Sequence, residues 1–422
     1  MKTLQTDYIA ILKREIKPAV GCTEPVAVAF AAAAARKAAG TGPAVKIDLV
    51  CSGNIIKNAM GVRIPGADAF GVKMAAALGA VAGDPEKELE VLSDISPGQV
   101  EAAKTLCGSG IQLDTDPLLP KLYISVTVQT GDFQTGKAVI RERHDSISRL
   151  EHNGKIIFQA SPEKSAETTD LPKSSIHGIY DFIYEVDAGQ LGLIEKSIRL
   201  NMALSKAGLR EPFGHEVGRR LVGAYENEEA FSYAVALTAA GSDARMAGLS
   251  MPAMSNSGSG NQGICATVPV AAIGEKKGIP REKILRACTL SNLIAIHCKQ
   301  SFGRLSPLCG AVGAAIGASA GITYLLGGGL EQIMSSIQNM LGSVMGMLCD
   351  GAKAGCAMKV SACTFAAIQS TLLALSDECV CPMEGIIETD VEKTLENIGK
   401  LSSGGMLEID PLLLKIMTQK ER

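Results

Sequence analysis

Three cysteines in the C-terminal half have the residue type and spacing from which an iron site can be built. Cys309 lies in RLSPLCGAVG, and Cys349 and Cys356 bracket the Gly- and Ala-rich segment CDGAKAGC. Such a loop can fold back so that both of its sulfurs point to one centre, where thiolates ligate iron. An iron–sulfur cubane held by only three thiolates leaves one iron open as a Lewis acid. Three buried helix cysteines would show the same spacing, so the residues alone leave both interpretations open.

A second segment, SNSGSGNQG at residues 255–263, is a candidate anion-binding loop. Its small and amide residues expose backbone N–H groups and side-chain donors, the type of surface that cradles a carboxylate or a phosphate. Apolar sequences on both sides favour a loop held against a core over a flexible surface loop. The candidate donors and acceptors are Asn256, Ser257, Ser259 and Asn261.

The segment GCTEPVAVAF at residues 21–30 predicts the start of a helix that carries a thiol. Thr23 can cap this helix, with Glu24 in its first turn, so that Cys22 lies at the positive end of the helix dipole. A thiol in that position can have its pKa lowered toward neutrality, which suits a base or a nucleophile. The alternative is a helix start whose cysteine only packs.

Polar residues also gather in CSGNIIKNAMGVRIPG at residues 51–66, where Asn54 and Arg63 stand near glycine turns. They could line an anionic site, although a solvated loop explains the pattern almost as well. Two histidines give a contrast: His144 lies in polar surroundings and predicts a surface residue, whereas His297 lies in the apolar stretch LIAIHCKQ and predicts a core residue.

Two regions of different periodicity must position these residues. Alternating β-rich segments at 45–51, 122–130 and 136–144, followed by SISRLEH and KIIFQ, predict strands in a mostly antiparallel sheet. After a polar, linker-like stretch at 161–175, nearly every window has helical periodicity. We therefore expect an α+β fold: an N-terminal α+β domain at residues 1–186, then an all-α domain at 187–422 that carries the three cysteines.

Composition narrows the classes of function. Lys and Arg total 41 and Asp and Glu total 44, so the net charge of -3 disfavours nucleic acid and an anionic membrane as partners. Charges throughout residues 2–17 leave no apolar stretch for a signal peptide, which predicts a cytoplasmic protein. In that reducing compartment, 12 cysteines favour buried thiols, metal ligands or catalytic thiolates over disulfides. The uncharged segment 308–326 is rich in Gly and Ala, so we expect a buried helix and no membrane span.

Together, GCTEPVA, the SNSGSGNQG loop with its preceding DARMAG, and CDGAKAGCAMK resemble the serine dehydratase-like family, which includes L-cysteine desulfidases. The resemblance runs in the same order from residue 20 to about residue 365. It implies an oxygen-sensitive [4Fe–4S] cluster bound by three cysteines, which fall on Cys309, Cys349 and Cys356. The more distant iron–sulfur L-serine dehydratases have a wider spacing between the last two cluster cysteines and an early SSHT-type motif. This sequence has neither, so the resemblance favours cysteine over serine.

The reaction that the resemblance implies is β-elimination from a small L-amino acid without pyridoxal phosphate (PLP). For L-cysteine the products are pyruvate, ammonia and sulfide; L-serine dehydration is the alternative, and a non-catalytic iron–sulfur redox or iron sensor is a further one. We nominate Cys22 as the base. The predicted substrate-binding residues are Thr23, Glu24, Asn54, Arg63, Asn256, Ser257, Ser259 and Asn261.

Two further expectations concern the cofactor and the assembly. A PLP-dependent lyase would do the same reaction, but the helical second half lacks the strand and helix alternation of those folds. No lysine stands out as the residue that would bind PLP. We expect a small-molecule substrate and a homo-oligomer, a dimer.

Overall fold

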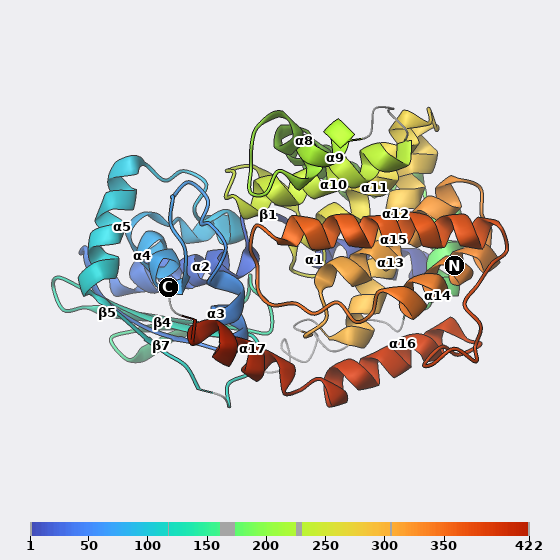
Figure 1. Ribbon diagram of the computed structural model, residues 1–422. Helices are drawn as coiled ribbons and strands as arrows, with labels where there is room; N and C mark the ends of the chain where they lie inside the picture. The colour runs from blue at the N-terminus through green and yellow to red at the C-terminus, as the bar shows by residue number, and fades with distance from the viewer. Residues whose placement is uncertain (1, 117, 161–173, 225–229, 304–305, 421–422) are drawn as a thin grey trace.

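Two regions lie side by side in the computed structural model, which describes residues 2–116, 118–160, 174–224, 230–303 and 306–420 (Figure 1). The N-terminal region combines a six-stranded sheet with helices, and the second region is largely helical. The predicted α+β fold, with a helical part after it, is thus confirmed. Most of the stretch predicted as a linker, residues 161–173, lies outside the described residues.

The sheet of the N-terminal region has the strand order β3-β2-β4-β5-β6-β7. Only β2 and β3 pair in parallel, and every other neighbouring pair is antiparallel. The five predicted strands are all present, and the structure adds β3 at one edge, whose four residues are too few to show a period. The strands are β2 (Ala44–Cys51), β3 (Ile111–Asp114), β4 (Tyr123–Thr130), β5 (Thr135–Arg141), β6 (Ile147–His152) and β7 (Lys155–Gln159).

Helices cover one face of this sheet. The alanine-rich α2 contacts β4 and β5 and also packs against α4, and nearly all of its residues are buried because short side chains allow close approach. These elements share one core with Ile47, Leu49 and Val126 of the strands. The helices are α2 (Thr23–Ala39), α3 (Gly53–Ala59), α4 (Val72–Ala82) and α5 (Pro97–Ser109), with the short 3-10 helix η1 (Pro85–Glu90).

The helical region is a bundle around α13, a helix whose residues from Ala311 to Leu325 are all buried. This confirms the buried helix expected over the uncharged segment. The central α13 spans Gly310–Leu325, and the other members are α1 (Lys2–Glu15), α7 (Ile176–Glu185), α8 (Gly192–Arg210), α9 (Val217–Ala224), α10 (Ala230–Met246), α11 (Gly260–Lys276), α12 (Arg281–Phe302), α14 (Leu330–Ser343), α15 (Cys356–Leu375) and α16 (Val391–Lys400), with the short 3-10 helix η2 (Ala188–Leu191) and the π-helical turn η3 (Leu401–Gly405). The last helix, α17 (Ile409–Thr418), leaves the bundle.

One helix in the described part of the chain, α15, has the length and apolar composition that a bilayer crossing would need. Half of its most apolar window is buried against the bundle. His297 of α12 is buried, as predicted for a core residue, and its ring contacts Ser174 and Glu392.

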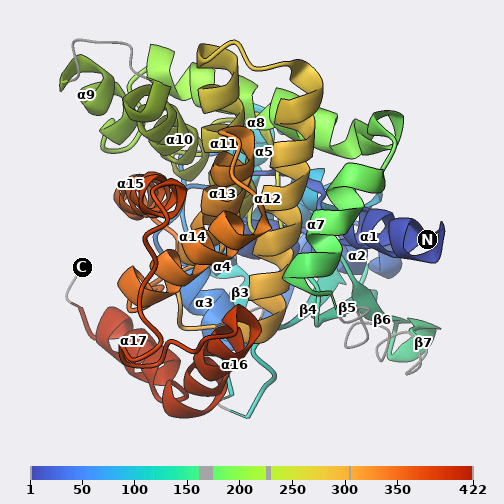
Figure 2. The ribbon, with the colours of Figure 1, turned by 90° about the vertical axis from the view of Figure 1, so that its right-hand side faces the viewer.

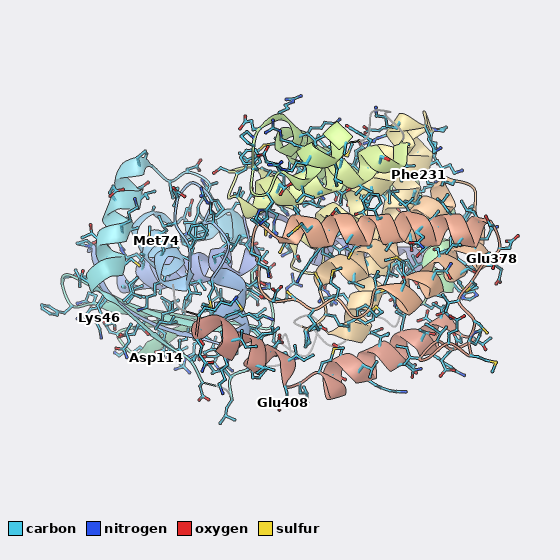
Figure 3. The ribbon with its side chains drawn as sticks, viewed as in Figure 1. Lys46, Met74, Asp114, Phe231, Glu378 and Glu408 are labelled. Carbon is cyan, nitrogen blue, oxygen red and sulfur yellow. The ribbon has the colours of Figure 1, made fainter. Side chains whose placement is uncertain are left out.

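The chain crosses between the two regions at both of its ends. Although α1 and α7 precede residue 187, they pack in the core of the helical region, beside α12 (Figure 2). At the other end, the chain passes Glu408 and enters α17, which packs against α3 of the N-terminal region (Figure 3). Two short strands, β1 (Pro18–Val20) and β8 (Pro252–Met254), form a separate antiparallel pair.

A candidate active site between the two regions

A polar cavity lies where α2 and α3 of the N-terminal region meet the helical bundle. It has two adjoining chambers of about 90 Å³ each, which share Glu24, Asn58, Ser259, Gly310 and Cys349 in their walls. We call the first the cysteine chamber, lined also by Cys22, Arg245, Asn261, Cys309 and Cys356. The second is the lysine chamber, lined also by Asn54, Lys57, His144, Ser257, Gln262 and Lys299.

The β1–β8 pair brings two distant motifs together at this cavity. Val20 of β1 lies opposite Pro252, and the GCTEP motif follows β1 directly. The backbone pairing continues into the SNSGSGNQG loop, since the Ser255 amide donates to the Lys17 carbonyl at 2.8 Å. The helix-start thiol and the polar loop therefore lie side by side, although more than half of the chain separates them.

Four helices begin at the wall of the cysteine chamber. Cys22, Ser259 and Cys309 are the N-cap residues of α2, α11 and α13, and Cys356 is the first residue of α15. All four residues line the chamber. Because a helix N-terminus carries a partial positive charge and unpaired N–H groups, this convergence favours anions and thiolates.

The three C-terminal cysteines are brought together by a small backbone pairing. The Cys309 amide donates to the Met347 carbonyl at 2.9 Å, and the Cys349 amide donates to the Pro307 carbonyl at 2.7 Å. Gly351 then adopts a φ of +91°, and a Cβ there would lie 2.4 Å from the carbonyl oxygen of Lys57. Only glycine lets the CDGAKAGC loop pass this closely beneath α3.

Electrostatics show that these thiols are neighbours. Burial, together with the nearby Cys349 and Cys356, raises the pKa of Cys309 to about 12. Burial also raises the pKa of Cys356, with Cys349 adding to the effect. In the residues that the structure describes, no three His, Cys, Asp or Glu side chains stand close enough together to hold a single metal ion. The three thiols instead stand around one chamber.

The Cys22 thiol faces a carboxylate. It donates a hydrogen bond to Glu24 Oε2 at 3.1 Å, and the Thr23 hydroxyl donates to the same oxygen at 3.1 Å. Burial and the adjacent Glu24 raise the pKa of Cys22 well above its ordinary value. The predicted lowering by the helix terminus is therefore wrong, because removal from water and a neighbouring negative charge outweigh the dipole. Thr23 is also not the cap; the helix begins at Thr23, and Cys22 precedes it.

Glu24 is held as an anion. Burial raises its pKa, but His144 and hydrogen bonds from Cys22 and Asn58 outweigh that effect, so the pKa lies below its ordinary value. The Asn58 amide donates to Glu24 Oε1 at 2.8 Å. His144 is 8% exposed and lines the lysine chamber, so the surface position predicted for it is wrong. The polar residues around it belong to an interior cavity.

Arg245, in the segment DARMAG, is a residue of the cysteine chamber that was not among the predicted site residues. It is 3% exposed, and it donates to Asn261 Oδ1 at 3.2 Å. A Cβ at Gly260 would lie 2.2 Å from Arg245 Nε, so the glycine in the loop makes room for the guanidinium. Two charged residues, Asp243 and Arg245, stand in a helix that is otherwise rich in apolar and small residues, and this pattern could have revealed the site because buried charges need partners.

The residues of the SNSGSGNQG loop have different positions relative to the two chambers. Ser257 and Ser259 line the lysine chamber, and Ser259 and Asn261 line the cysteine chamber. Asn256 lines neither, because hydrogen bonds within the loop and to α12 use both ends of its side-chain amide. The amide nitrogen donates to Asn292, and Asn256 Oδ1 accepts from Ser257 and Gln262. The structure thus makes Asn256 a support of the loop.

Asn54 and Arg63, the two candidates from residues 51–66, differ in whether they reach the cavity. Asn54 lines the lysine chamber and donates to Asp410 Oδ2 at 2.9 Å. Arg63 does not reach either chamber: its guanidinium pairs with Asp68 at 2.8 Å, half exposed, and lies over the Phe70 ring. Its predicted contact with the substrate is not part of this arrangement.

Several buried polar atoms at the cavity have no hydrogen-bond partner among the described residues. They are Asn58 Oδ1, Arg245 Nε and Gln262 Oε1. Buried polar atoms are nearly always paired, so each of these suits a bound molecule. Three thiols, four helix N-termini and these atoms together fit an anionic cluster and a small zwitterionic ligand.

Comparison with known proteins places this site in context. A sequence model of the family described as "Serine dehydratase alpha chain" matches residues 86–415. A UPF0597 protein of Oleidesulfovibrio alaskensis is 42% identical over 430 residues, covering 98% of each chain. The UPF0597 protein of Bacteroides thetaiotaomicron is 42% identical over 423 residues, with 98% of this chain and 97% of the relative covered. That of Porphyromonas gingivalis is 40% identical over 434 residues, with 99% of each covered.

Proposed function

Because this chain belongs to the serine dehydratase alpha chain family, we propose that its cavity catalyses β-elimination from a small L-amino acid. The proposed substrate is L-cysteine, which gives pyruvate, ammonia and sulfide. The observation that supports this most is the gathering of Cys309, Cys349 and Cys356 around one chamber that also holds the half-buried Glu24 carboxylate and the buried Arg245 guanidinium.

The three cysteines would hold a [4Fe–4S] cluster. Each cluster ligand binds its own iron, so thiols that stand around a chamber suit a cluster better than a single ion. Cys309 and Cys356 lie at the positive ends of α13 and α15, which stabilise thiolate charge. With three protein ligands, such a cluster supplies one open iron that polarises the leaving group.

Arg245 and the polar loop would bind the amino acid. The Arg245 guanidinium, with Nε unpaired among the described residues, suits the substrate carboxylate. Asn58 Oδ1 and Glu24 are acceptors at the shared wall of the two chambers and suit the ammonium group. Ser259 and Asn261 complete the polar side of the cysteine chamber.

Cys22 and Glu24 would remove the α-proton together. As the Cys22 sulfur takes the proton from Cα, its own thiol proton moves in the same step to the Glu24 carboxylate, 3.1 Å away, so no free thiolate has to form against the raised pKa of Cys22. The electron pair left on Cα forms the Cα–Cβ double bond as the bond from Cβ to sulfur breaks, and hydrosulfide leaves. The aminoacrylate hydrolyses to pyruvate and ammonia. The raised pKa makes the Cys22 sulfur a stronger proton acceptor in this step.

L-Serine is the second candidate, because the matched family carries serine dehydratase in its description. The same residues would then release hydroxide in place of hydrosulfide, with pyruvate and ammonia as products. Sulfide release distinguishes the two substrates.

The test is to purify the protein without air and to measure iron, acid-labile sulfide and turnover. Cys309→Ser, Cys349→Ser and Cys356→Ser should each lose iron and pyruvate formation, whereas Cys288→Ser, a buried thiol on α12, should keep both. Full iron in any of the three variants would remove that residue from the ligand set. Iron without turnover on L-cysteine, L-serine or other β-substituted amino acids would favour the non-catalytic sensor.

A further inference from the structure

The outer face of α15 carries an uncovered apolar stripe. Met358, Phe365 and Leu372 are 55%, 39% and 45% exposed, and Ala362 and Gln369 are exposed between them. The helix runs along the front of the helical region in Figure 1 and is seen end-on at the edge of the molecule in Figure 2. Large apolar side chains in a row at a surface mark a contact site.

The spacing of the stripe indicates what covers it. Its five residues follow one another at alternating intervals of four and three, which is the heptad seam of a helix that packs lengthwise on another helix. A second copy of the same chain supplies a seam of the same length and spacing. We propose that the protein is a homodimer in which the α15 helices of two copies pack antiparallel about a two-fold axis near Phe365.

The charges at the two ends of the stripe fit this arrangement. In an antiparallel pair centred on Phe365, Met358 of one copy faces Leu372 of the other. Lys353 and Asp377 lie at equal distances along the chain from Phe365, so each basic end meets an acidic end. Lys353 and Lys359 share the single carboxylate of Asp350, which leaves the start of α15 positive.

The acidic end is open to solvent, since Asp377 and Glu378 are both exposed. Antiparallel packing also places the positive N-terminal end of each α15 beside the negative C-terminal end of the other, which favours this orientation. Between its two ends the exposed face of α15 has no charge, so a two-fold axis brings no like charges together in the middle of the contact.

A membrane would be the other apolar occupant of this face, because α15 has the length and composition of a spanning helix. The opposite face of the helix, however, is buried against the bundle. The acidic residues Asp377 and Glu378 follow its last turn, and anionic lipid surfaces attract basic residues there. The heptad spacing and the charges therefore favour the second copy, whatever chemistry the cavity performs.

The first test is the mass of the full chain in solution, by size-exclusion chromatography with light scattering. The wild-type protein should run at twice its 43.9 kDa chain mass. Phe365→Glu places two carboxylates at the axis and should shift the mass to that of a monomer. Phe133→Glu is the matched control, because Phe133 is 80% exposed in the turn between β4 and β5, away from the stripe. This variant should stay dimeric. A monomeric wild type, or an unchanged mass for Phe365→Glu, would overturn the proposal.

A cross-linking test serves if the glutamate variant does not fold. In a background with Cys379→Ser and Cys381→Ser, which removes the two exposed cysteines, Phe365→Cys should be joined into dimers by a short bis-maleimide. Met383→Cys, at a residue that is 91% exposed, should not be joined. Equal cross-linking of both variants contradicts the two-fold axis, and wild-type monomers that sediment with phosphatidylserine vesicles would assign the stripe to a membrane.

Discussion

The buried ion pair between Lys57 and Asp410 should hold the C-terminal helix and the cysteine loop together. Lys57 Nζ lies 2.6 Å from Asp410 Oδ1, and the two side chains are 2% and 10% exposed. The same ammonium donates to the Cys349 carbonyl at 3.1 Å. One cation thus links α3, α17 and the loop that carries a proposed cluster ligand.

Removing the carboxylate leaves that cation buried and unpaired. Breaking one side of a buried ion pair typically costs about 3–5 kcal/mol, against a total stability of roughly 5–15 kcal/mol for a folded protein. We therefore expect Asp410→Ala to lower the free energy of unfolding by about 3 kcal/mol or more. Replacing both partners, as Lys57→Met with Asp410→Leu, should recover most of the loss, because no charge then remains in the interior.

Urea unfolding followed by circular dichroism measures this energy, with iron content after anaerobic purification as the second readout. The matched control is Asp48→Ala, which breaks the Lys46–Asp48 pair at 3.0 Å on the sheet, where both side chains are about half exposed (Lys46 is labelled in Figure 3). Exposed pairs contribute about 0–1 kcal/mol. If the free energies of unfolding of Asp410→Ala and the Asp48→Ala control differ by less than about 1 kcal/mol, the ion pair does not hold the loop.

Three further changes probe the cavity and its surroundings. Gly260→Ala puts a Cβ 2.2 Å from Arg245 Nε and should raise KM about tenfold or more, since a hydrogen bond to a charged group is worth about 1.5–3 kcal/mol; an unchanged KM would separate Arg245 from the substrate. Glu24→Gln should lower kcat about 10²-fold while iron content stays constant, because it removes the proton acceptor; normal turnover would clear Glu24. Burial raises the pKa of Asp243 from 3.8 to about 6. The protonated Asp243 therefore contributes fully to the stability of the fold below pH 3.8, and this contribution is lost as the pH rises through about 6. The Tm of Asp243→Asn should therefore fall less than that of the wild type from about pH 4 to about pH 7, and parallel curves would refute the assignment.

The elements of the fold followed from local patterns. Alternation over Tyr123–Thr130 and Thr135–Arg141 predicted two central strands, and the uncharged Gly- and Ala-rich run predicted the buried α13. Such patterns record which face of a segment meets a core, and a few neighbouring residues suffice to show it. The segments β1, β3 and β8 have three or four residues each and carry no readable period.

Residue types and spacing alone identified the side chains that have the chemistry for the site. The thiols, the polar loop and the helix start were visible as residue types and spacing. Of the eight predicted substrate-binding residues, all except Arg63 lie at the cavity or, in the case of Asn256, directly behind it. Residue type is a local property, so no fold is needed to find it.

How these residues are used depends on contacts that exist only in the folded protein. The fold buries the Cys22 thiol beside Glu24, and this raises the pKa of Cys22, which a helix terminus alone would lower. The fold also buries His144, and it places Arg245 in the wall of the cysteine chamber, packed against Gly260. Burial and the charges nearby fix the energy of an ionisable group, and both come from segments that lie far apart in the chain and meet only in the folded protein.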